Sequence, residues 1–255
     1  MDGLIAHVSD LHFGREDPAV VQGLVLDLKE QNPALIVVSG DLTQRARTAE
    51  FSAAKRFLAE LPFPKLVVPG NHDIPLLHLW ERFLYPFRRY NECISAPLNP
   101  FVDMPPFAIV GINTVVPRRW KEGRISSAEF SRVKEILKSV SRERINVLVM
   151  HHPLREALSR PVNMKWFEEL KIRIILSGHH HLESSAMVPL EGTMLGQTVT
   201  WIQAGTAVSV RHRGEANSYN LIRIDKNNLN VYARVWSGKR FELKIRRVFD
   251  LKIAE

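Results

Sequence analysis

Three short apolar runs near the start of the chain each end at a group of polar side chains. The runs are residues 4–8, 35–38 and 66–68, and the polar groups beyond them are Asp10 with His12, Asp41, and Asn71 with His72 and Asp73. Continuous apolar runs of this length are typical of strands in a sheet that is covered on both faces. Because the carboxyl ends of parallel strands meet at one edge of a sheet, we expect the three polar groups to converge there.

Helical patterns occupy the stretches between these runs. Asp17-Pro18 predicts the start of a first helix, because proline fits the first helical position. Thr48 is a suitable cap for a second helix, and Ser126 with Glu129 has the pattern of a capping box for a third. Strands that alternate with helices predict an open, largely parallel α/β sheet.

The remainder of the chain predicts a second sheet. Further apolar runs lie at residues 107–112, 145–150 and 172–176, and the last two end at His151 and at Gly178-His179. Strand patterns then dominate at 198–202, 219–224 and 229–236, with a hairpin turn at 225–228. We expect this sheet to be mixed or antiparallel and to pack on the first.

The basic tail at residues 239–247 alternates in the manner of a half-solvated strand. Phe241, Leu243 and Ile245 are expected to point one way, and the charged residues between them the other way. Apart from Phe241, no aromatic side chain interleaves with the charges, whereas single-stranded nucleic acid would require several. We therefore favour a solvated strand over a nucleic-acid patch at this position.

Residues 74–106 break the alternation of strands and helices. Aromatic residues and arginines are followed there by several prolines, so we expect a helix and then an irregular loop. This insertion follows His72 directly and is compatible with a wall over a site or with a plain surface segment. Either way, we find no linker that divides the chain and expect one domain over residues 1–255.

Composition limits the possible partners and the compartment. The formal charge of +8 favours anionic partners such as phosphorylated substrates. No apolar stretch of about 18 residues or more is present, and the start lacks the layout of a signal peptide, so we expect a cytoplasmic protein without membrane contact. The single cysteine, Cys93, can form no internal disulfide. Nucleic acid is compatible with the charge but not favoured, and a homo-oligomer is compatible with the sequence.

The polar groups share a chemistry that suits metal ions. Carboxylates, imidazoles and one carboxamide are hard and borderline ligands, and together they are numerous enough for two metal ions. Mn, Fe and Zn all accept such ligands, so the sequence does not select among them. Two ions held close together predict hydrolysis of a phosphate ester by in-line attack of a metal-activated hydroxide.

Five blocks carry a family resemblance over most of the chain. The blocks are Ser9 to His12, Ser39 to Thr43, Pro69 to Asp73, Met150 to Pro153 and Ser177 to His181. In this order they resemble the calcineurin-like metallophosphoesterase superfamily, which implies a four-layer α/β/β/α sandwich of two mixed sheets flanked by helices. Ala204 to Ala207, followed by Arg211, Arg213 and Ser218 to Asn220, is similar to the branch of bacterial cyclic-nucleotide phosphodiesterases and glycerophosphodiesterases.

The resemblance implies a role for each residue of the blocks. One metal ion would be bound by Asp10, His12, Asp41 and His181, and the other by Asp41, Asn71, His151 and His179. Asp41 would bridge the two ions, since a carboxylate has two oxygens. His72 would donate a proton or a hydrogen bond to the leaving oxygen, and Asp73 would orient the His72 imidazole.

Several alternatives stay open at the level of single residues. His151 is favoured over His152 as a ligand because it is the first residue of His-x-Pro. His180 is expected to face away from its two neighbours, and His7 to be a hydrogen-bonded core histidine. Arg15, Arg211 and Arg213 are candidates for binding the substrate phosphate or base, although each is as readily a surface residue.

The predicted function is hydrolysis of a small phosphodiester, with a cyclic nucleotide as the leading substrate. A nuclease and a phosphomonoesterase or protein phosphatase of the same fold are the alternatives. A non-catalytic binding scaffold, which resembles the retromer subunit of this fold, is the least favoured because the set of ligands is complete.

Overall fold

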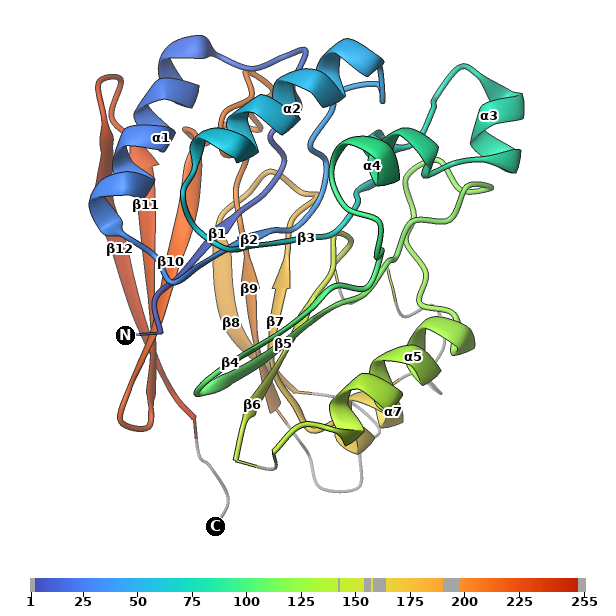
Figure 1. The fold of residues 1–255 in the computed structure, drawn as a ribbon. Helices are drawn as coiled ribbons and strands as arrows, with labels where there is room; N and C mark the ends of the chain where they lie inside the picture. The colour runs from blue at the N-terminus through green and yellow to red at the C-terminus, as the bar shows by residue number, and fades with distance from the viewer. Residues whose placement is uncertain (1–2, 142, 154–156, 158–163, 190–197, 252–255) are drawn as a thin grey trace.

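Two six-stranded sheets face each other and carry helices on their outer faces (Figure 1). The structure is a computed structural model that describes residues 3–141, 143–153, 157, 164–189 and 198–251. Three apolar cores separate the layers: helices on the first sheet, sheet on sheet, and the second sheet on its own helices. This arrangement confirms the predicted four-layer sandwich.

The first sheet has the strand order β12-β11-β10-β1-β2-β3. Its strands are β1 (Ile5–Val8), β2 (Leu35–Val38), β3 (Lys65–Val67), β10 (Ser218–Asp225), β11 (Asn228–Trp236) and β12 (Phe241–Asp250). The first three strands run parallel to one another, and β10, β11 and β12 join them in antiparallel pairs. The sheet is therefore mixed, and its parallel half corresponds to the three apolar runs.

The second sheet has the order β4-β5-β6-β7-β9-β8. Its strands are β4 (Phe101–Met104), β5 (Phe107–Gly111), β6 (Ile145–Val149), β7 (Ile172–Ser177), β8 (Ser184–Pro189) and β9 (Thr198–Gln203). The four inner strands are parallel, and the two edge strands are antiparallel to their neighbours. The sequence patterns did not predict the edge strands β4 and β8.

The helices cover the two outer faces. On the first sheet lie α1 (Pro18–Gln31) and α2 (Thr48–Glu60), and on the second sheet lie α5 (Ser127–Lys138) and α7 (Met164–Glu169) (Figure 1). Two short helices, α3 (Leu79–Leu84) and α4 (Arg88–Cys93), follow the 3-10 turn η1 (Asn71–Asp73). Parallel β1, β2, β3, β6 and β7 direct their carboxyl ends to one edge of the sandwich, where the polar blocks follow.

The predicted helix starts are largely confirmed. The Asp17 carboxylate accepts the backbone N–H of Ala19 at 2.8 Å, and the Ser126 hydroxyl accepts that of Glu129 at 3.2 Å. Thr48 is the first helical residue and not the cap of α2. The Glu50 carboxylate instead accepts the backbone N–H groups of the preceding loop, those of Arg45 and Arg47.

Residues 74–106 differ from the expected helix and irregular loop. They form two short helices, and residues 101–104 form the edge strand β4, which pairs with β5. Arg82 fixes α3 in place, because its guanidinium donates to the carbonyls of Pro75, Pro117 and Arg119 at 2.7 to 2.9 Å. Trp80, on the same helix, is 83% exposed, so α3 presents apolar surface outward.

The tail forms the predicted strand but not the predicted alternation. The pairing of β11 with β12 shifts register, so that Ala233 pairs with Ile245 and the next residue, Arg234, pairs with Leu243. Ala233 and Arg234 are neighbours in β11 and point to opposite faces of the sheet. Their partners Ile245 and Leu243 therefore also point to opposite faces, which is not the predicted alternation. Both are partly exposed, at 52% and 37%.

No described helix is long and apolar enough to cross a membrane.

One buried ion pair fastens α1 to the first sheet. Asp27 on α1 accepts two hydrogen bonds from the guanidinium of Arg234, at 2.5 and 2.6 Å, and a third from the Tyr219 hydroxyl. The Asp27 side chain is 6% exposed and that of Arg234 14%. Removing one partner of such a pair leaves a buried charge without compensation.

We therefore predict that Asp27→Ala lowers the free energy of unfolding by about 3 to 5 kcal/mol. Tyr219→Phe removes one hydrogen bond and costs about 1 kcal/mol. Lys29→Ala is the control, because its ion pair with Glu60 is largely exposed and is worth less than about 1 kcal/mol. Denaturant unfolding measures all three, and equal losses for Asp27→Ala and Lys29→Ala would show that the pair does not hold α1.

Candidate metal centre

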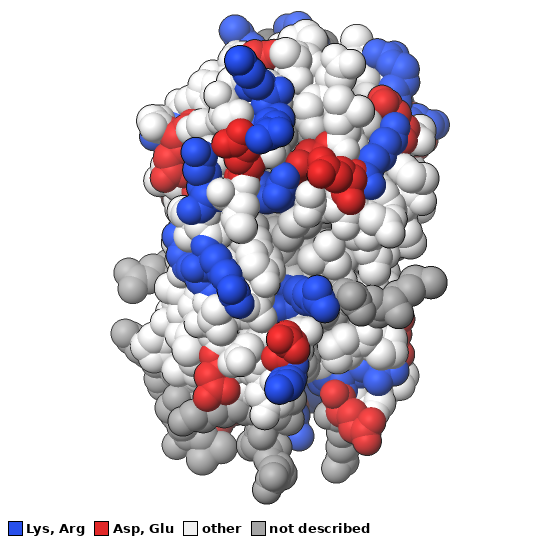
Figure 2. Space-filling model, turned by 90° about the vertical axis from the view of Figure 1, so that its left-hand side faces the viewer, with Lys and Arg blue, Asp and Glu red and all other residues white. Residues whose placement is uncertain are grey.

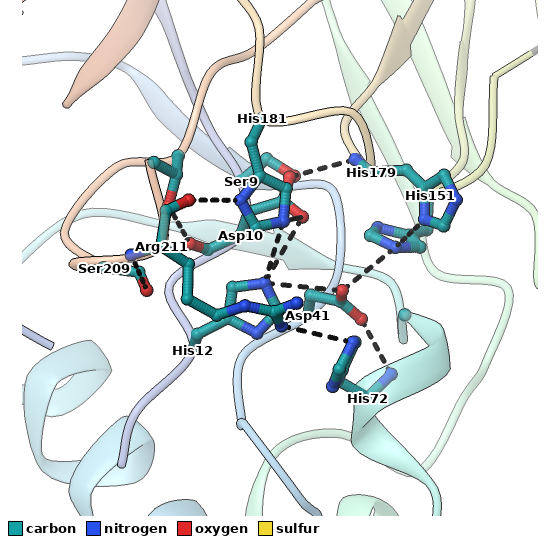
Figure 3. A network of polar contacts seen from close by, with 12 residues as sticks. Ser9, Asp10, His12, Asp41, His72, His151, His179, His181, Ser209 and Arg211 are labelled. Carbon is teal, nitrogen blue, oxygen red and sulfur yellow. Dashed lines mark hydrogen bonds and ion pairs between the residues drawn. The ribbon is translucent and has the colours of Figure 1, made fainter. Parts of the chain in front are cut away.

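Seven predicted ligands from both sheets converge on one point at the edge of the sandwich (Figure 3). Asp10 and His12 follow β1, Asp41 follows β2, and Asn71 opens the turn after β3. From the second sheet, His151 follows β6, and His179 and His181 follow β7. The structure thus brings together groups that are up to 171 positions apart in the chain.

The backbone of the centre is strained. Nine described residues other than glycine have a positive φ, and five of these nine are predicted ligands: Asp10, His12, Asp41, His179 and His181. Side chains rarely adopt this conformation, because the β-carbon crowds the backbone. Concentrated strain of this kind marks positions where the surrounding structure fixes the geometry for function.

A first donor group consists of Asp10, His12 and His181. The Nε2 atoms of the two histidines lie 3.1 Å apart. The Asp10 Oδ1 atom lies 3.7 Å from the first of them and 3.4 Å from the second. Donor atoms about 2.1 Å from one tetrahedral ion are about 3.4 Å apart, so this group has the spacing of a metal site.

A second donor group surrounds His151. Its Nε2 atom lies 3.2 Å from Asn71 Oδ1, 3.2 Å from His179 Nδ1 and 3.3 Å from Asp41 Oδ2. An amide oxygen and imidazole nitrogens are both suitable ligands for borderline divalent ions. The second group therefore has the same spacing and a similar chemistry.

Asp41 joins the two groups through a single oxygen atom. Its Oδ2 lies 3.6 Å from His12 Nε2 and 3.3 Å from His151 Nε2. Its Oδ1 is already used, because it accepts the backbone N–H of His72 at 2.8 Å. The sequence argument assigned one oxygen to each ion, whereas the structure turns one oxygen toward both groups.

Backbone carbonyls set the protonation of three imidazoles. The Nδ1 atoms of His12, His151 and His181 lie 3.3, 2.8 and 2.9 Å from the carbonyl oxygens of Thr43, Ser39 and Arg211. A carbonyl only accepts, so each Nδ1 carries a proton, and a ring without a second proton turns the lone pair of Nε2 toward the centre. The Nε2 lone pairs of His12 and His181 thus face each other and suit a shared cation.

One further feature tests whether the residues fit metal ions. Asp10 Oδ1 is buried and has no hydrogen-bond partner among the described residues, whereas Oδ2 of the same carboxylate accepts the backbone N–H of His179 at 3.0 Å. A buried carboxylate oxygen without a partner is costly unless a cation compensates it. The donor set therefore fits two bound ions.

Burial and charge act in opposite directions on the central pair. Burial alone would raise the pKa of Asp41, but the charges of His151 and His72 bring it well below its usual value. Burial would lower the pKa of His151, but Asp41 raises it to about 9. In contrast, burial lowers the pKa of His12 well below its usual value and that of His179 to about 3. The centre thus favours an ionised Asp41 beside a protonated His151, while His12 and His179 stay neutral.

His72 is positioned beside the centre by Gln44. Its Nδ1 donates to the Gln44 carbonyl at 2.8 Å, which leaves only Nε2 for further contacts of the ring. Arg211 reaches toward His72 from its loop (Figure 3), and its Nη1 lies 3.4 Å from both His72 Nε2 and Gln44 Oε1. These contacts are long for hydrogen bonds, so the guanidinium is only weakly engaged.

The prediction that Asp73 orients the His72 imidazole is contradicted. The Asp73 carboxylate accepts the backbone N–H groups of Leu42, Thr43 and Gly70 and the Thr43 hydroxyl, at 2.9 to 3.2 Å. Burial and then the charge of Asp41 raise its pKa to about 6. Asp73 therefore ties the loop of Asp41 to the turn of Asn71.

The sequence analysis did not identify Gln44 as the residue whose carbonyl orients His72. The only signal for it in the sequence was its position three residues after Asp41.

The ambiguous histidines separate in the structure. His151 faces Asp41, whereas the Nδ1 of His152 pairs with the Thr114 hydroxyl at 2.8 Å. His152 nevertheless lies close to His151 and His179, and within the described part of the chain its buried Nε2 has no hydrogen-bond partner. His180 is half-buried outside the donor groups, and His7 is a buried strand residue that contacts the Ser39 hydroxyl at 2.9 Å.

Arg15 and Arg213, the other two candidate arginines, have no polar side-chain contact with the described residues of the centre. The side chains of Arg15 and Arg213 are exposed and form no hydrogen bond or ion pair with other described residues. The Arg15 backbone does run beside the Arg211 loop, because its carbonyl accepts the N–H of Val210 at 2.9 Å. The role of both arginines in substrate binding stays a prediction.

The face that includes α1, β11 and β12 carries mixed charges (Figure 2). Lys244 and Arg240 both pair with Glu242, and Arg247 pairs with Glu183. Cations and carboxylates alternate over this surface, so it lacks the continuous positive stripe that nucleic acid requires. The charges of the tail therefore support the solvated strand.

Comparison with known proteins agrees with this geometry. The profile of calcineurin-like phosphoesterases matches residues 3–183. A probable cyclic nucleotide phosphodiesterase of Synechococcus sp. is 25% identical over 202 residues, which cover 69% of this chain and 72% of that protein. The glycerophosphodiester phosphodiesterase GpdQ of Enterobacter lignolyticus is 34% identical over 82 residues, which cover 28% of this chain and only 29% of that protein. A dimetal phosphatase from Danio rerio shares the fold, with a TM-score of 0.67 and 11% identity over 99% of this chain and all of that one.

We predict that Gly178→Ala weakens metal binding at the first donor group. A β-carbon at this position would lie 1.9 Å from Ser9 Oγ and 2.5 Å from Asp10 Oδ2, so Asp10 must move. Elemental analysis after dialysis should find fewer ions per chain than in the wild type. Gly238→Ala is the control for backbone strain alone, because its φ of +93° disfavours alanine but an added β-carbon meets no described atom within 4 Å beyond its chain neighbours. Full metal content in Gly178→Ala with an unchanged circular dichroism spectrum would contradict the prediction.

We also predict that metal removal destabilises the folded chain. An ion that binds only the folded state adds about 2.7 kcal/mol at a free concentration 100 times its Kd. Chelation should therefore lower the Tm by several degrees, and added Mn should restore it. Asp41→Asn should abolish the response, because Asp41 faces both donor groups. The same Tm with and without chelator would rule out ions that support the fold.

Proposed function

Because this chain belongs to the calcineurin-like phosphoesterase family, we propose that it hydrolyses a small phosphodiester, with a cyclic nucleotide as the leading candidate. The coarser activity, that of a metallophosphoesterase, follows from the family itself. One observation carries the proposal: a single oxygen of Asp41 faces two complete donor groups. Two ions held side by side are suited to in-line displacement at phosphorus.

The proposed ligands divide as the two donor groups do. Asp10, His12 and His181 would hold one ion, and Asn71, His151 and His179 the other, with Asp41 shared. Bound there, the ions would supply an acidified water and a counter-charge for the equatorial phosphate oxygens. Carbonyls behind three imidazoles keep their Nε2 lone pairs directed inward, so the chain orients its ligands in advance.

His72 and Arg211 are the groups we propose for the substrate itself. Gln44 occupies the Nδ1–H of His72, so the proton or hydrogen bond given to the leaving oxygen would come from Nε2 of the doubly protonated imidazolium. The weakly engaged guanidinium of Arg211 can turn from His72 to a phosphate oxygen, to which it would donate charge-assisted hydrogen bonds. Arg15 and Arg213 are proposed as outer contacts only.

The two curated relatives favour a diester as substrate. One is named for cyclic nucleotides and the other for glycerophosphodiesters. A nuclease is less favoured, because the surface over β11 and β12 mixes its charges (Figure 2). A phosphomonoesterase or protein phosphatase remains the alternative within the fold. The complete donor set argues against a binding scaffold without activity.

A substrate panel tests the proposal. Bis(p-nitrophenyl) phosphate, p-nitrophenyl phosphate, cyclic nucleotides, glycerophosphodiesters and single-stranded DNA are each assayed with added Mn. The highest kcat/KM is expected for a small diester. Preference for the monoester over every diester would overturn the substrate class, and no turnover in protein that contains both metals would overturn the activity.

We predict that His72→Ala lowers kcat by about 10² to 10⁴ for diesters with an alcohol leaving group. The loss should be much smaller for a p-nitrophenyl leaving group, which needs no proton. The backbone N–H of residue 72 still donates to Asp41 in this variant, so metal content should not change. His212→Ala, at an exposed histidine, serves as the control. Equal losses for both leaving groups would contradict the proton-donor role.

A further inference from the structure

A cationic cavity opens beside the candidate metal centre. Its volume is about 290 Å³, and it is lined by Arg45, Arg47, Thr48, Leu76, Leu77, His78 and Arg89. Three of these seven residues are arginines, and none of the seven is acidic. No role in the proposed reaction uses this cavity.

Two segments that line the cavity continue from loops of the metal centre. Gln44, which holds His72 through its carbonyl, is followed directly by Arg45. Leu76, which also lines the cavity, follows His72 by four residues. Helices α2 and α4 pack against each other beside these loops (Figure 1). A ligand whose leaving group lies at His72 would therefore extend toward the cavity.

Of the three cavity arginines, Arg89 alone pairs with a carboxylate among the described residues. Among the described residues, no carboxylate lies within 4 Å of the guanidinium nitrogens of Arg45 or Arg47, and both side chains are exposed. The nearby Glu50 carboxylate is engaged by the backbone N–H groups of Arg45 and Arg47, at 2.7 and 3.2 Å. Two arginines are thus available to a ligand.

Arg89 fixes the shape of the cavity. Its Nη1 donates to the Ala46 carbonyl at 2.7 Å, and its Nη2 to Glu81 at 2.7 Å. The first bond ties α4 to the loop that bears Arg45 and Arg47, and the second ties α4 to α3. The wall is therefore held in place before any ligand binds, which reduces the entropy cost of binding.

The start of α2 adds partial positive charge, part of which the Glu50 carboxylate in the first turn offsets. Thr48, which lines the cavity, is the first residue of this 13-residue helix. The first N–H groups of a helix have no intrahelical acceptor, and the helix dipole places partial positive charge there. Phosphate groups are common ligands of such positions, particularly where arginines are near.

We propose that this cavity binds a second phosphate of the substrate while the scissile phosphodiester lies at the metal centre. The proposal rests on the proposed phosphodiesterase function and narrows its substrate class. A cyclic mononucleotide has one phosphate and leaves the cavity without an anion. A nucleotide with two phosphoryl groups, such as a cyclic dinucleotide or a dinucleotide with a terminal phosphate, occupies both positions.

Kinetics of matched substrates test this assignment. The wild type should show a higher kcat/KM for a cyclic dinucleotide than for a cyclic mononucleotide. The double variant Arg45→Gln, Arg47→Gln should reduce that ratio about tenfold or more, chiefly through KM, because two charge-assisted contacts are lost. Arg240→Gln, an 80% exposed arginine on another face, should keep the wild-type ratio. An unchanged ratio in the double variant overturns the proposal.

A binding measurement keeps this test separate from the proposed activity. Inorganic pyrophosphate is titrated calorimetrically into metal-free protein at low salt. The double variant should bind at least about tenfold more weakly than the wild type, and Arg240→Gln should bind equally well. Equal binding by all three proteins overturns the cavity as an anion site. Absent turnover of every diester, with pyrophosphate binding still dependent on Arg45 and Arg47, overturns only the proposed phosphodiesterase function and the substrate assignment that rests on it.

Discussion

The approach of the Asp41 carboxylate to histidines of both sheets is the contact on which the centre depends. His12 follows a strand of the first sheet, and His151 follows a strand of the second. The two residues can share one oxygen only because the sheets pack face to face through a common apolar core. Each donor group also draws ligands from both sheets. The packing of the sandwich is therefore a condition for the metal site as well as for stability.

Close backbone contacts hold the centre in this strained form. Gly70 and Gly178 lie so near Asp41 and Asp10 that a β-carbon would overlap the carboxylates. The φ of Gly40 is +94°, a conformation that glycine adopts without strain. Backbone hydrogen bonds from Asp10 to Gly40 and from His12 to Asp41 keep neighbouring loops together. Five ligand residues have a positive φ, and the conformational strain of their backbone is offset by the backbone hydrogen bonds between these loops.

The structure revised roles that residue type alone had suggested. Asp73 follows His72 directly, which suggested a hydrogen bond between its carboxylate and the imidazole. The carboxylate instead accepts hydrogen bonds from three backbone N–H groups. A main-chain carbonyl, that of Gln44, does the orienting instead. Any residue can supply a carbonyl, so a sequence pattern carries no signal for this contact. The same holds for the carbonyls that set the protonation of His12, His151 and His181.

The sequence by itself determined the fold class and the set of residues that meet at the site, because apolar runs predict buried strands and strand ends carry the polar blocks. It did not predict the edge strands β4 and β8, which have weak apolar patterns since one side of each faces solvent. Only the tertiary structure decided which oxygen of Asp41 faces both groups, which nitrogen of each imidazole is free, and that three arginines line one cavity. Those outcomes depend on distances between loops far apart in the chain, and such distances are set by the packing of two sheets.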